Sequence, residues 1–88
     1  MQVEIVDIRK SALDGNLKAF ADVRFDAQLI IKGFSVMNGK NGLFVSLPKK
    51  AGKDGRWFDF LLVDDALKHE VEDKVLKAYE REVDGARV

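Results

Sequence analysis

The stretch that decides the fold is NGKNGLFVSLPKKAGKDGRWFDF, residues 38–60. A glycine-punctuated turn (38–42) leads into a short apolar run (43–47), and the chain's only proline, Pro48, ends that run. Because proline has no N–H for a strand ladder, it predicts the end of a strand or an edge strand. The apolar run has few polar positions, which predicts a strand covered on both sides. A basic, glycine-containing loop (49–56) and a second apolar run follow.

Three antiparallel strands are expected before this stretch. Residues 2–10 are rich in Val and Ile, and the phase of their alternation changes, which predicts either cover on both faces or a β-bulge. Residues 17–25 alternate cleanly, and the two alanines in the middle of their apolar face predict a closely packed helix. Residues 29–37 form the third strand, and Gly33 predicts a bulge or a close backbone approach.

Turn residues separate the expected strands. Asp14-Gly15 and Asp54-Gly55 are hairpin signals, because glycine takes a positive φ without cost and aspartate tolerates it. Residues 26–28, Asp-Ala-Gln, form a short reversal between the second and third strands. After the basic loop, a fifth strand is predicted from Trp57 to about Val63.

The C-terminal part predicts one amphipathic helix. Asp64 or Asp65 can cap it by accepting a hydrogen bond from an orphan backbone N–H. Glu70–Lys74 and Asp73–Lys77 are acid-first i,i+4 pairs on its wet side, and Gly85 is a stop signal. Its apolar stripe consists of Leu67, Val71, Val75, Ala78 and Tyr79. We therefore predict an α+β fold: an antiparallel sheet of four to five strands with one C-terminal helix packed on it.

Composition narrows the class of protein. The 88 residues suit a single domain spanning 1–88, and 47% hydrophobic with 34% charged residues suits a folded chain. The absence of cysteine excludes disulfide and thiolate chemistry and fits a reducing cytoplasm. The N-terminus lacks the features of a signal peptide, and no apolar run approaches the ~20 residues that span a bilayer. We expect a cytoplasmic protein without a membrane span.

The net charge of zero hides one basic segment. Residues 1–60 hold ten basic and seven acidic side chains, a net charge of +3, whereas residues 61–88 hold five and eight, a net charge of −3. Between residues 40 and 56 there are five basic side chains and one acidic side chain, Asp54, a net charge of +4. This local excess of positive charge predicts an anionic partner.

No motif points to catalysis. His69, the only histidine, lies among charged residues and offers no metal-ligand spacing, so it is interpreted as a solvated surface residue. Ser11, Ser35 and Ser46 lack a G-x-S-x-G context, and the Asp64-Asp65 pair is better explained by helix capping. We expect no enzyme activity, no metal, no cofactor and no small-molecule substrate, because a chain of this size forms no deep polar pocket.

The basic loop after Pro48 is the strongest functional signal. Lysine contacts phosphate without selecting a base, and an exposed ring at Trp57 or Phe58 can stack on an unpaired base. Strand neighbours alternate, so if Trp57 points out, Phe58 points in. The other interpretation is that the lysines keep a hairpin tip soluble and the aromatic residues are core. The turn 38–42 lacks the P-loop spacing and is interpreted as a plain turn. The candidate nucleic-acid-binding residues are Lys49, Lys50, Lys53 and Arg56.

From Val3 to about Tyr79 the chain closely resembles the stage V sporulation protein G family, the SpoVG septation regulators. The most specific marker is NGLFVSLP at 41–48. The other markers are VDIRK at 6–10, Asp14-Gly15, Lys18-Ala19, Phe25-Asp26, Val36-Met37, Asp54-Gly55, Phe58-Asp59 and Val75-Leu76 followed by Tyr79.

The resemblance implies a small bacterial homodimer that binds DNA, and also RNA, as a regulator of septation and sporulation. The family's basic positions after the proline correspond to Lys49 and Lys50, with Lys53 and Arg56 close by. This chain departs from the family where Lys49 replaces a serine and Gly52-Lys53 replaces a Thr-Pro, which adds charge. Residues 60–64 replace a His-Pro-Ile segment, so the start of the helix and the dimer geometry are open questions.

Two functional hypotheses follow. The first is a homodimeric nucleic-acid-binding regulator, in which strands pair across a two-fold axis and two copies of the 49–56 loop form a double basic patch. Its partners are DNA, with RNA as a second ligand, and a second copy of the chain. The alternative is a protein-interaction module of cell-division or developmental regulation, in which an edge or the third strand recruits a partner and the lysines only aid solubility.

Overall fold

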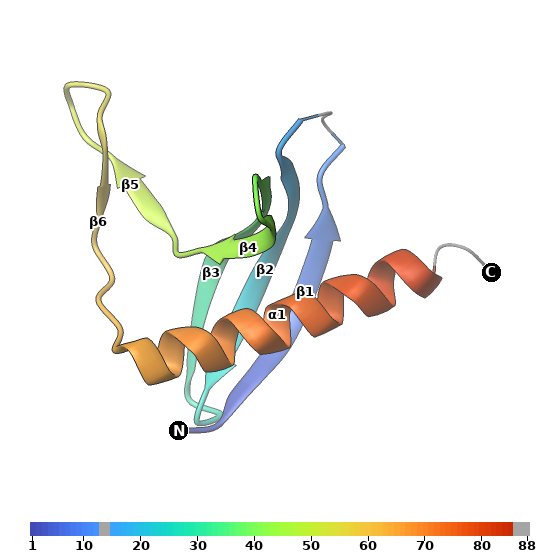
Figure 1. Cartoon of the computed structure of the whole chain (residues 1–88). Coiled ribbons are helices and arrows are strands. Elements are labelled where there is room, and N and C mark those ends of the chain that lie inside the picture. Colours follow the sequence, from blue (N-terminus) through green and yellow to red (C-terminus); the bar gives the residue numbers. More distant parts are fainter. Residues whose placement is uncertain (13–14, 86–88) are drawn as a thin grey trace.

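The computed structural model describes residues 1–12 and 15–85. Four strands form one antiparallel sheet in the order β1-β2-β3-β4, two more form a separate ribbon, and the helix packs across one face of the sheet (Figure 1). This confirms the predicted α+β class. The elements are β1 (Val3–Lys10), β2 (Leu17–Phe25), β3 (Leu29–Gly39), β4 (Gly42–Ser46), β5 (Lys49–Ala51), β6 (Trp57–Asp59) and α1 (Asp65–Gly85).

The core lies between the sheet and α1. Ala19 and Ala21 are fully buried in the same cluster as Val71 and Val75 of the helix, so the small side chains of β2 do face a closely packed helix, as predicted. The ring of Phe34 is also fully buried. The remaining buried hydrophobic residues are Val3, Val23, Phe25, Val36 and Val45.

The sheet contains three register shifts, and two of them lie where the sequence predicted an irregularity. The pairing of β1 with β2 shifts between Ile5 and Asp7, so Val6 is the extra residue of a β-bulge, one of the two predicted alternatives. The pairing of β2 with β3 shifts beside Gly33, whose φ is 92°. A side chain at Gly33 would begin 4.0 Å from Cβ of Pro48, so both the bulge and the close approach predicted for this glycine are present.

The described turns follow the predictions. Asp26 and Ala27 both take positive φ (53° and 59°), and the N–H of Gln28 closes the turn on the carbonyl of Phe25 at 3.1 Å. Gly55 takes a φ of 83° in the Asp54-Gly55 turn. Asp14, the first residue of the other predicted hairpin turn, lies outside the described residues.

The prediction that the run 43–47 is covered on both sides is wrong. The strand β4 is the outer strand of the sheet, so only its inner neighbour β3 pairs with it. Val45 is buried against the core, whereas Leu43 and Phe44 remain 38% and 43% exposed. Pro48 directly follows this edge, in agreement with the other part of the prediction.

Two further boundaries differ from the predictions. Residues 49–51 of the predicted loop form the strand β5, which pairs with β6. The fifth strand, predicted to reach Val63, ends at Asp59, because β5 provides ladder partners only for residues 57–59. A strand persists only where its backbone groups find partners, and residues 60–64 therefore form an irregular linker to the helix.

The helix begins and is stabilised as predicted, with Asp64 as its cap. The Asp64 carboxylate accepts a hydrogen bond from the N–H of Leu67 at 2.9 Å. The ion pairs Glu70–Lys74 (3.3 Å) and Asp73–Lys77 (3.0 Å) are both present. Within residues 1–12 and 15–85, no helix has the length and apolar character needed to cross a membrane.

Helix side chains also reach both outer edges of the sheet. Lys74 donates a hydrogen bond from Nζ to the carbonyl of Val3 in β1 at 2.7 Å. At the opposite edge, the N–H of Val45 in β4 donates to the carboxylate of Glu72 at 3.4 Å. Each edge strand therefore has a backbone group occupied by the helix, which makes pairing with another chain less favourable there.

Candidate nucleic-acid interface

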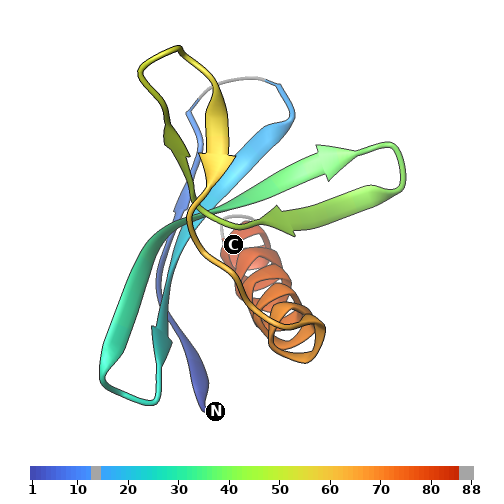
Figure 2. The ribbon, with the colours of Figure 1, turned by 90° about the vertical axis from the view of Figure 1, so that its left-hand side faces the viewer.

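The candidate site is a two-stranded ribbon that projects from the sheet and helix (Figures 1 and 2). We use the term ribbon for residues 49–59, which comprise β5, the loop 52–56 and β6. No Cα atom of β5 or β6 lies within 8 Å of a Cα atom in another described strand or helix. The ribbon closes by a hydrogen bond from the N–H of Gly52 to the carbonyl of Arg56 at 2.7 Å. All six residues of β5 and β6 are exposed, although Lys49 and Asp59 line a shallow hollow together with residues of β4 and Lys68 of α1.

The register of the ribbon divides the four predicted cations. Lys49 pairs with Asp59, Lys50 with Phe58 and Ala51 with Trp57. Cross-strand partners share a face, and successive residues alternate between faces. One face therefore carries Lys49 and Trp57, and the other carries Lys50 and Phe58.

Lys53 and Arg56 lie in the loop at the tip, beyond the paired strands. The structure thus brings the four predicted residues together on one ribbon, but not on one face.

Two of the four cations have acidic neighbours. Nζ of Lys49 lies 3.9 Å from a carboxylate oxygen of Asp59, and Nε of Arg56 lies 3.4 Å from one of Asp54. Both pairs are solvent-exposed, so they hold their cations only weakly. Lys50 and Lys53 have no ion-pair partner in the part of the chain that the structure describes.

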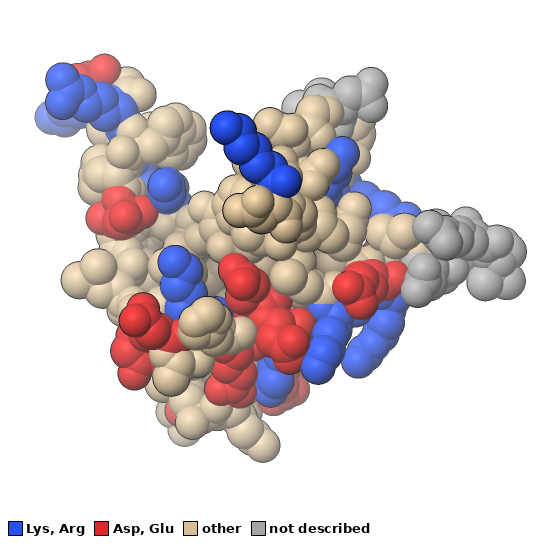
Figure 3. Space-filling model, viewed as in Figure 1, with Lys and Arg blue, Asp and Glu red and all other residues tan. Residues whose placement is uncertain are grey.

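The ribbon keeps a positive charge at a distance from the acidic helix. Its four cations outnumber Asp54 and Asp59, a net charge of +2. This is lower than the +4 of residues 40–56 because the ribbon includes Asp59 and excludes Lys40. In Figure 3 lysine and arginine side chains gather at the far end of the ribbon, at the upper left, whereas acidic side chains gather over α1. The molecule therefore has a positive end and an acidic body.

Both aromatic residues of the ribbon are exposed. Trp57 is 69% exposed and Phe58 48%, although they lie on opposite faces, because neither face is covered. The expectation that one of them points into a core is therefore wrong, and so is the interpretation of both as core residues. Beyond the ribbon, Phe60 (56%) and Leu62 (93%) extend the exposed apolar surface along the linker. Sequence analysis missed these two residues because it placed them inside a strand.

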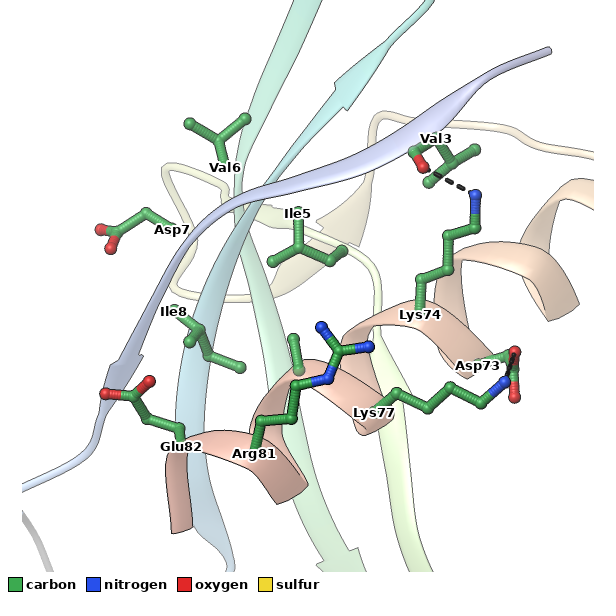
Figure 4. A pocket seen from close by; sticks show the side chains of 11 residues that line it. Val3, Ile5, Val6, Asp7, Ile8, Asp73, Lys74, Lys77, Arg81 and Glu82 are labelled. Atoms are coloured by element: carbon green, nitrogen blue, oxygen red, sulfur yellow. Dashed lines mark hydrogen bonds and ion pairs between the residues drawn. The ribbon is translucent and has the colours of Figure 1, made fainter. Parts of the chain in front are cut away.

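A second cluster of cations lines a groove of about 700 Å³ between β1 and α1 (Figure 4). Lys74 is bonded to the carbonyl of Val3, and Lys77 is paired with Asp73. Arg81 points over the groove without an ion-pair partner among the described residues, but acidic side chains from both elements line the same groove. The groove therefore offers less free positive charge than the ribbon.

The most buried charge in the described chain serves the fold. The carboxylate of Asp22, only 7% exposed, accepts hydrogen bonds from both Nη atoms of Arg9 at 3.0 and 3.2 Å. These bonds lower the pKa of Asp22 despite its burial and raise the pKa of Arg9. Asp7 also accepts a bond from Arg9, at 2.6 Å. Among the described residues, no group of three or more His, Cys, Asp or Glu side chains is arranged to hold a metal ion.

The fold and the ribbon define a small α+β protein with an exposed basic projection. This chain belongs to the SpoVG family, whose model matches residues 1–81. The family resemblance found in the sequence is thereby confirmed.

Relatives cover most of the chain. A protein of Archaeoglobus fulgidus named "Putative septation protein SpoVG" is 40% identical over 82 residues, which span 90% of this chain and 96% of that protein. "Putative septation protein SpoVG 2" of Listeria monocytogenes is 34% identical over 82 residues, which span 92% of this chain and 80% of that protein. A "Putative septation protein SpoVG" of Clostridium acetobutylicum is 32% identical over 82 residues, which span 92% of this chain and 86% of that protein.

Proposed function

We propose that this protein is a homodimeric nucleic-acid-binding regulator that acts in septation, and that it binds DNA or RNA through the ribbon. The observation that carries the proposal is a projecting ribbon with four cations and two exposed aromatic rings. Membership of the SpoVG family and the septation names of its relatives support the biological role.

The charge distribution favours phosphate as the ligand of the ribbon. Lysine and arginine on a projecting element release counterions when they meet a polyanion, which makes binding salt-dependent. The acidic side chains over α1 repel the same polyanion, so the ribbon is the end of the molecule that it approaches first.

Exposed apolar side chains support the homodimer. Phe44 on the edge of the sheet and Phe60 and Leu62 on the linker are all large, hydrophobic and exposed. A second copy related by a two-fold axis would cover these residues and present two ribbons to one ligand. The helix contacts at the outer edges of β1 and β4 favour a side-chain interface over strand pairing.

The test is a titration with duplex DNA, single-stranded DNA and RNA at several salt concentrations. The variants are Lys49→Ala, Lys50→Ala, Lys53→Ala, Arg56→Ala and the combination of all four. Each single change should weaken binding and reduce the slope of log affinity against log salt by about 0.7–0.9. Lys77→Ala, at the groove between β1 and α1 and outside the ribbon, is the control and should leave both quantities unchanged.

One variant should act in the opposite direction. Asp59→Asn removes the carboxylate 3.9 Å from Lys49, so the affinity for nucleic acid should rise. If the fourfold variant binds like the natural protein, the ribbon is not the site. If the natural protein binds none of the nucleic acids, the proposed function is wrong.

A protein-interaction module in cell division is the second candidate function. Trp57, Phe58, Phe60 and Leu62 are all exposed apolar residues within six positions of the chain, and exposed apolar patches mark protein contacts. This function predicts a partner that is recovered by pull-down with the natural protein and lost with Phe60→Ser and Leu62→Ser, together with no binding to nucleic acid.

A further inference from the structure

We infer that the ribbon binds unpaired nucleotides, with Trp57 as a platform on which a base stacks. The inference rests on the proposed function and specifies its ligand as single-stranded nucleic acid. Its starting point is the 69% exposure of Trp57, a large aromatic side chain on a ribbon whose strand Cα atoms lie more than 8 Å from those of every other described strand and helix.

The neighbours of Trp57 leave its ring accessible. Its cross-strand partner is Ala51, whose methyl group covers little of an indole face. Lys49 lies on the same face two residues along β5, which is about 7 Å at the rise of a β-strand. A base stacked on the indole therefore has a phosphate-binding ammonium group within reach of its own backbone.

The opposite face repeats this combination. Phe58 is 48% exposed, and its direct cross-strand partner is Lys50. The Phe58 ring lies close to Gly52: an added Cβ there would be 3.4 Å from the ring and 3.1 Å from a carboxylate oxygen of Asp54, so a larger residue would fit tightly. Each face of the ribbon thus carries one aromatic ring and one lysine.

This chemistry selects unpaired strands over duplexes. In a duplex the faces of the bases are stacked on one another, whereas in a single strand they are free to stack on a side chain. Stacking accepts every base, so the binding should tolerate many sequences. DNA and RNA single strands share this chemistry, and the experiment includes both.

The experiment uses the natural fluorescence of Trp57, which is the only tryptophan of the chain. The full protein is titrated with oligo(dT), oligo(U) and a DNA duplex of the same length. We expect saturable quenching with one or both single strands and an affinity for them about tenfold or more above that for the duplex. DNA and RNA are distinguished by which single strand binds more tightly.

Variants separate stacking from charge. Trp57→Ala should weaken single-strand binding about tenfold or more, measured by fluorescence anisotropy of a labelled oligonucleotide, and leave duplex binding unchanged. Trp57→Phe keeps a ring and should retain most of the affinity. Leu29→Ala, at the β2–β3 turn, where the side chain is 55% exposed, is the matched control outside both the ribbon and the linker and should bind like the natural protein.

Three results would overturn the inference. Equal affinity for single strands and duplex, or unchanged single-strand binding by Trp57→Ala, would mean that the ribbon contacts only phosphates. The proposed nucleic-acid binding would then remain, and base stacking on Trp57 would be refuted. An emission spectrum typical of a buried indole in the free protein would mean that a second copy covers Trp57. No binding to any of the three nucleic acids would refute both the inference and the proposed function.

Discussion

Arg9 shows how one side chain balances two acids across neighbouring strands. Asp7 and Asp22 are directly opposite each other in the register of β1 and β2, and like charges opposite each other destabilise a sheet. The guanidinium of Arg9 hydrogen-bonds to both carboxylates, so it offsets their mutual repulsion, and the cluster keeps a net charge of about −1. Because Arg9 is bonded to both acids, we interpret this cluster as a stabilising element of the sheet.

Removing Arg9 should therefore destabilise the protein. Arg9→Ala leaves the nearly buried Asp22 carboxylate without its partner, and we expect a loss of roughly 1–3 kcal/mol in the free energy of unfolding. Urea unfolding followed by circular dichroism measures this loss. Lys68→Ala on α1 is the control, and an Arg9→Ala protein as stable as the natural one would contradict the interpretation of the cluster.

The same cluster predicts a dependence on pH. The folded-state pKa of Asp22 lies below its ordinary value of 3.8, so the unfolded chain binds its proton first as the pH falls. This contribution to stability is complete well above pH 3.8 and is lost as the pH falls from there toward the folded-state pKa. Asp22→Asn should flatten this part of the stability curve in urea unfolding at a series of pH values. An acid limb as steep as that of the natural protein would contradict it.

At the scale of elements, the hydrophobic periodicity of a segment correctly predicted the type of the element and its buried side. The alternation in 17–25 and the spacing of Leu67, Val71 and Val75 gave the right elements, because their own residues set which side is buried. The cover of β4 and the length of β6 depend on which strands lie beside them, and no periodicity within 43–63 contains that information. For the same reason the ribbon's four cations could be listed from the sequence, but not their division between two faces.

The sequence allowed either Asp64 or Asp65 to cap the helix, and the structure identifies Asp64 as the cap. Asp64→Ala should lower the free energy of unfolding by about 1 kcal/mol, because the N–H of Leu67 loses its acceptor. Asp65→Ala is the matched control and should cost less, since Asp65 is the first helical residue and not the cap. Thermal or urea unfolding measures both, and equal losses would contradict the assignment of the cap.

At the scale of the whole molecule, charged and apolar surfaces lie on different parts of the chain. The ribbon has a net charge of +2, α1 has seven acidic against four basic side chains, a net charge of −3, and the linker carries Phe60 and Leu62. A dimer formed through the linker would leave both ribbons accessible. This separation makes dimerisation and ligand binding independently testable.

Changing Leu62 should affect assembly. We expect the natural protein to sediment with the mass of two chains and Leu62→Asp to shift toward one, because a charge cannot be buried without a partner in an apolar interface. The matched control is Leu29→Asp, at the β2–β3 turn, where the side chain is also exposed (55%). Sedimentation of the natural protein as a single chain at all concentrations would contradict the proposed dimer.

The ribbon follows Pro48, which lies near Gly33, and no Cα atom of its strands lies within 8 Å of another described strand or helix. The core is thereby insulated from the sequence of residues 49–59. Substitutions within the ribbon should therefore cost little in folding. An experimenter can vary or exchange residues 49–59 as a unit while the sheet and helix stay the same.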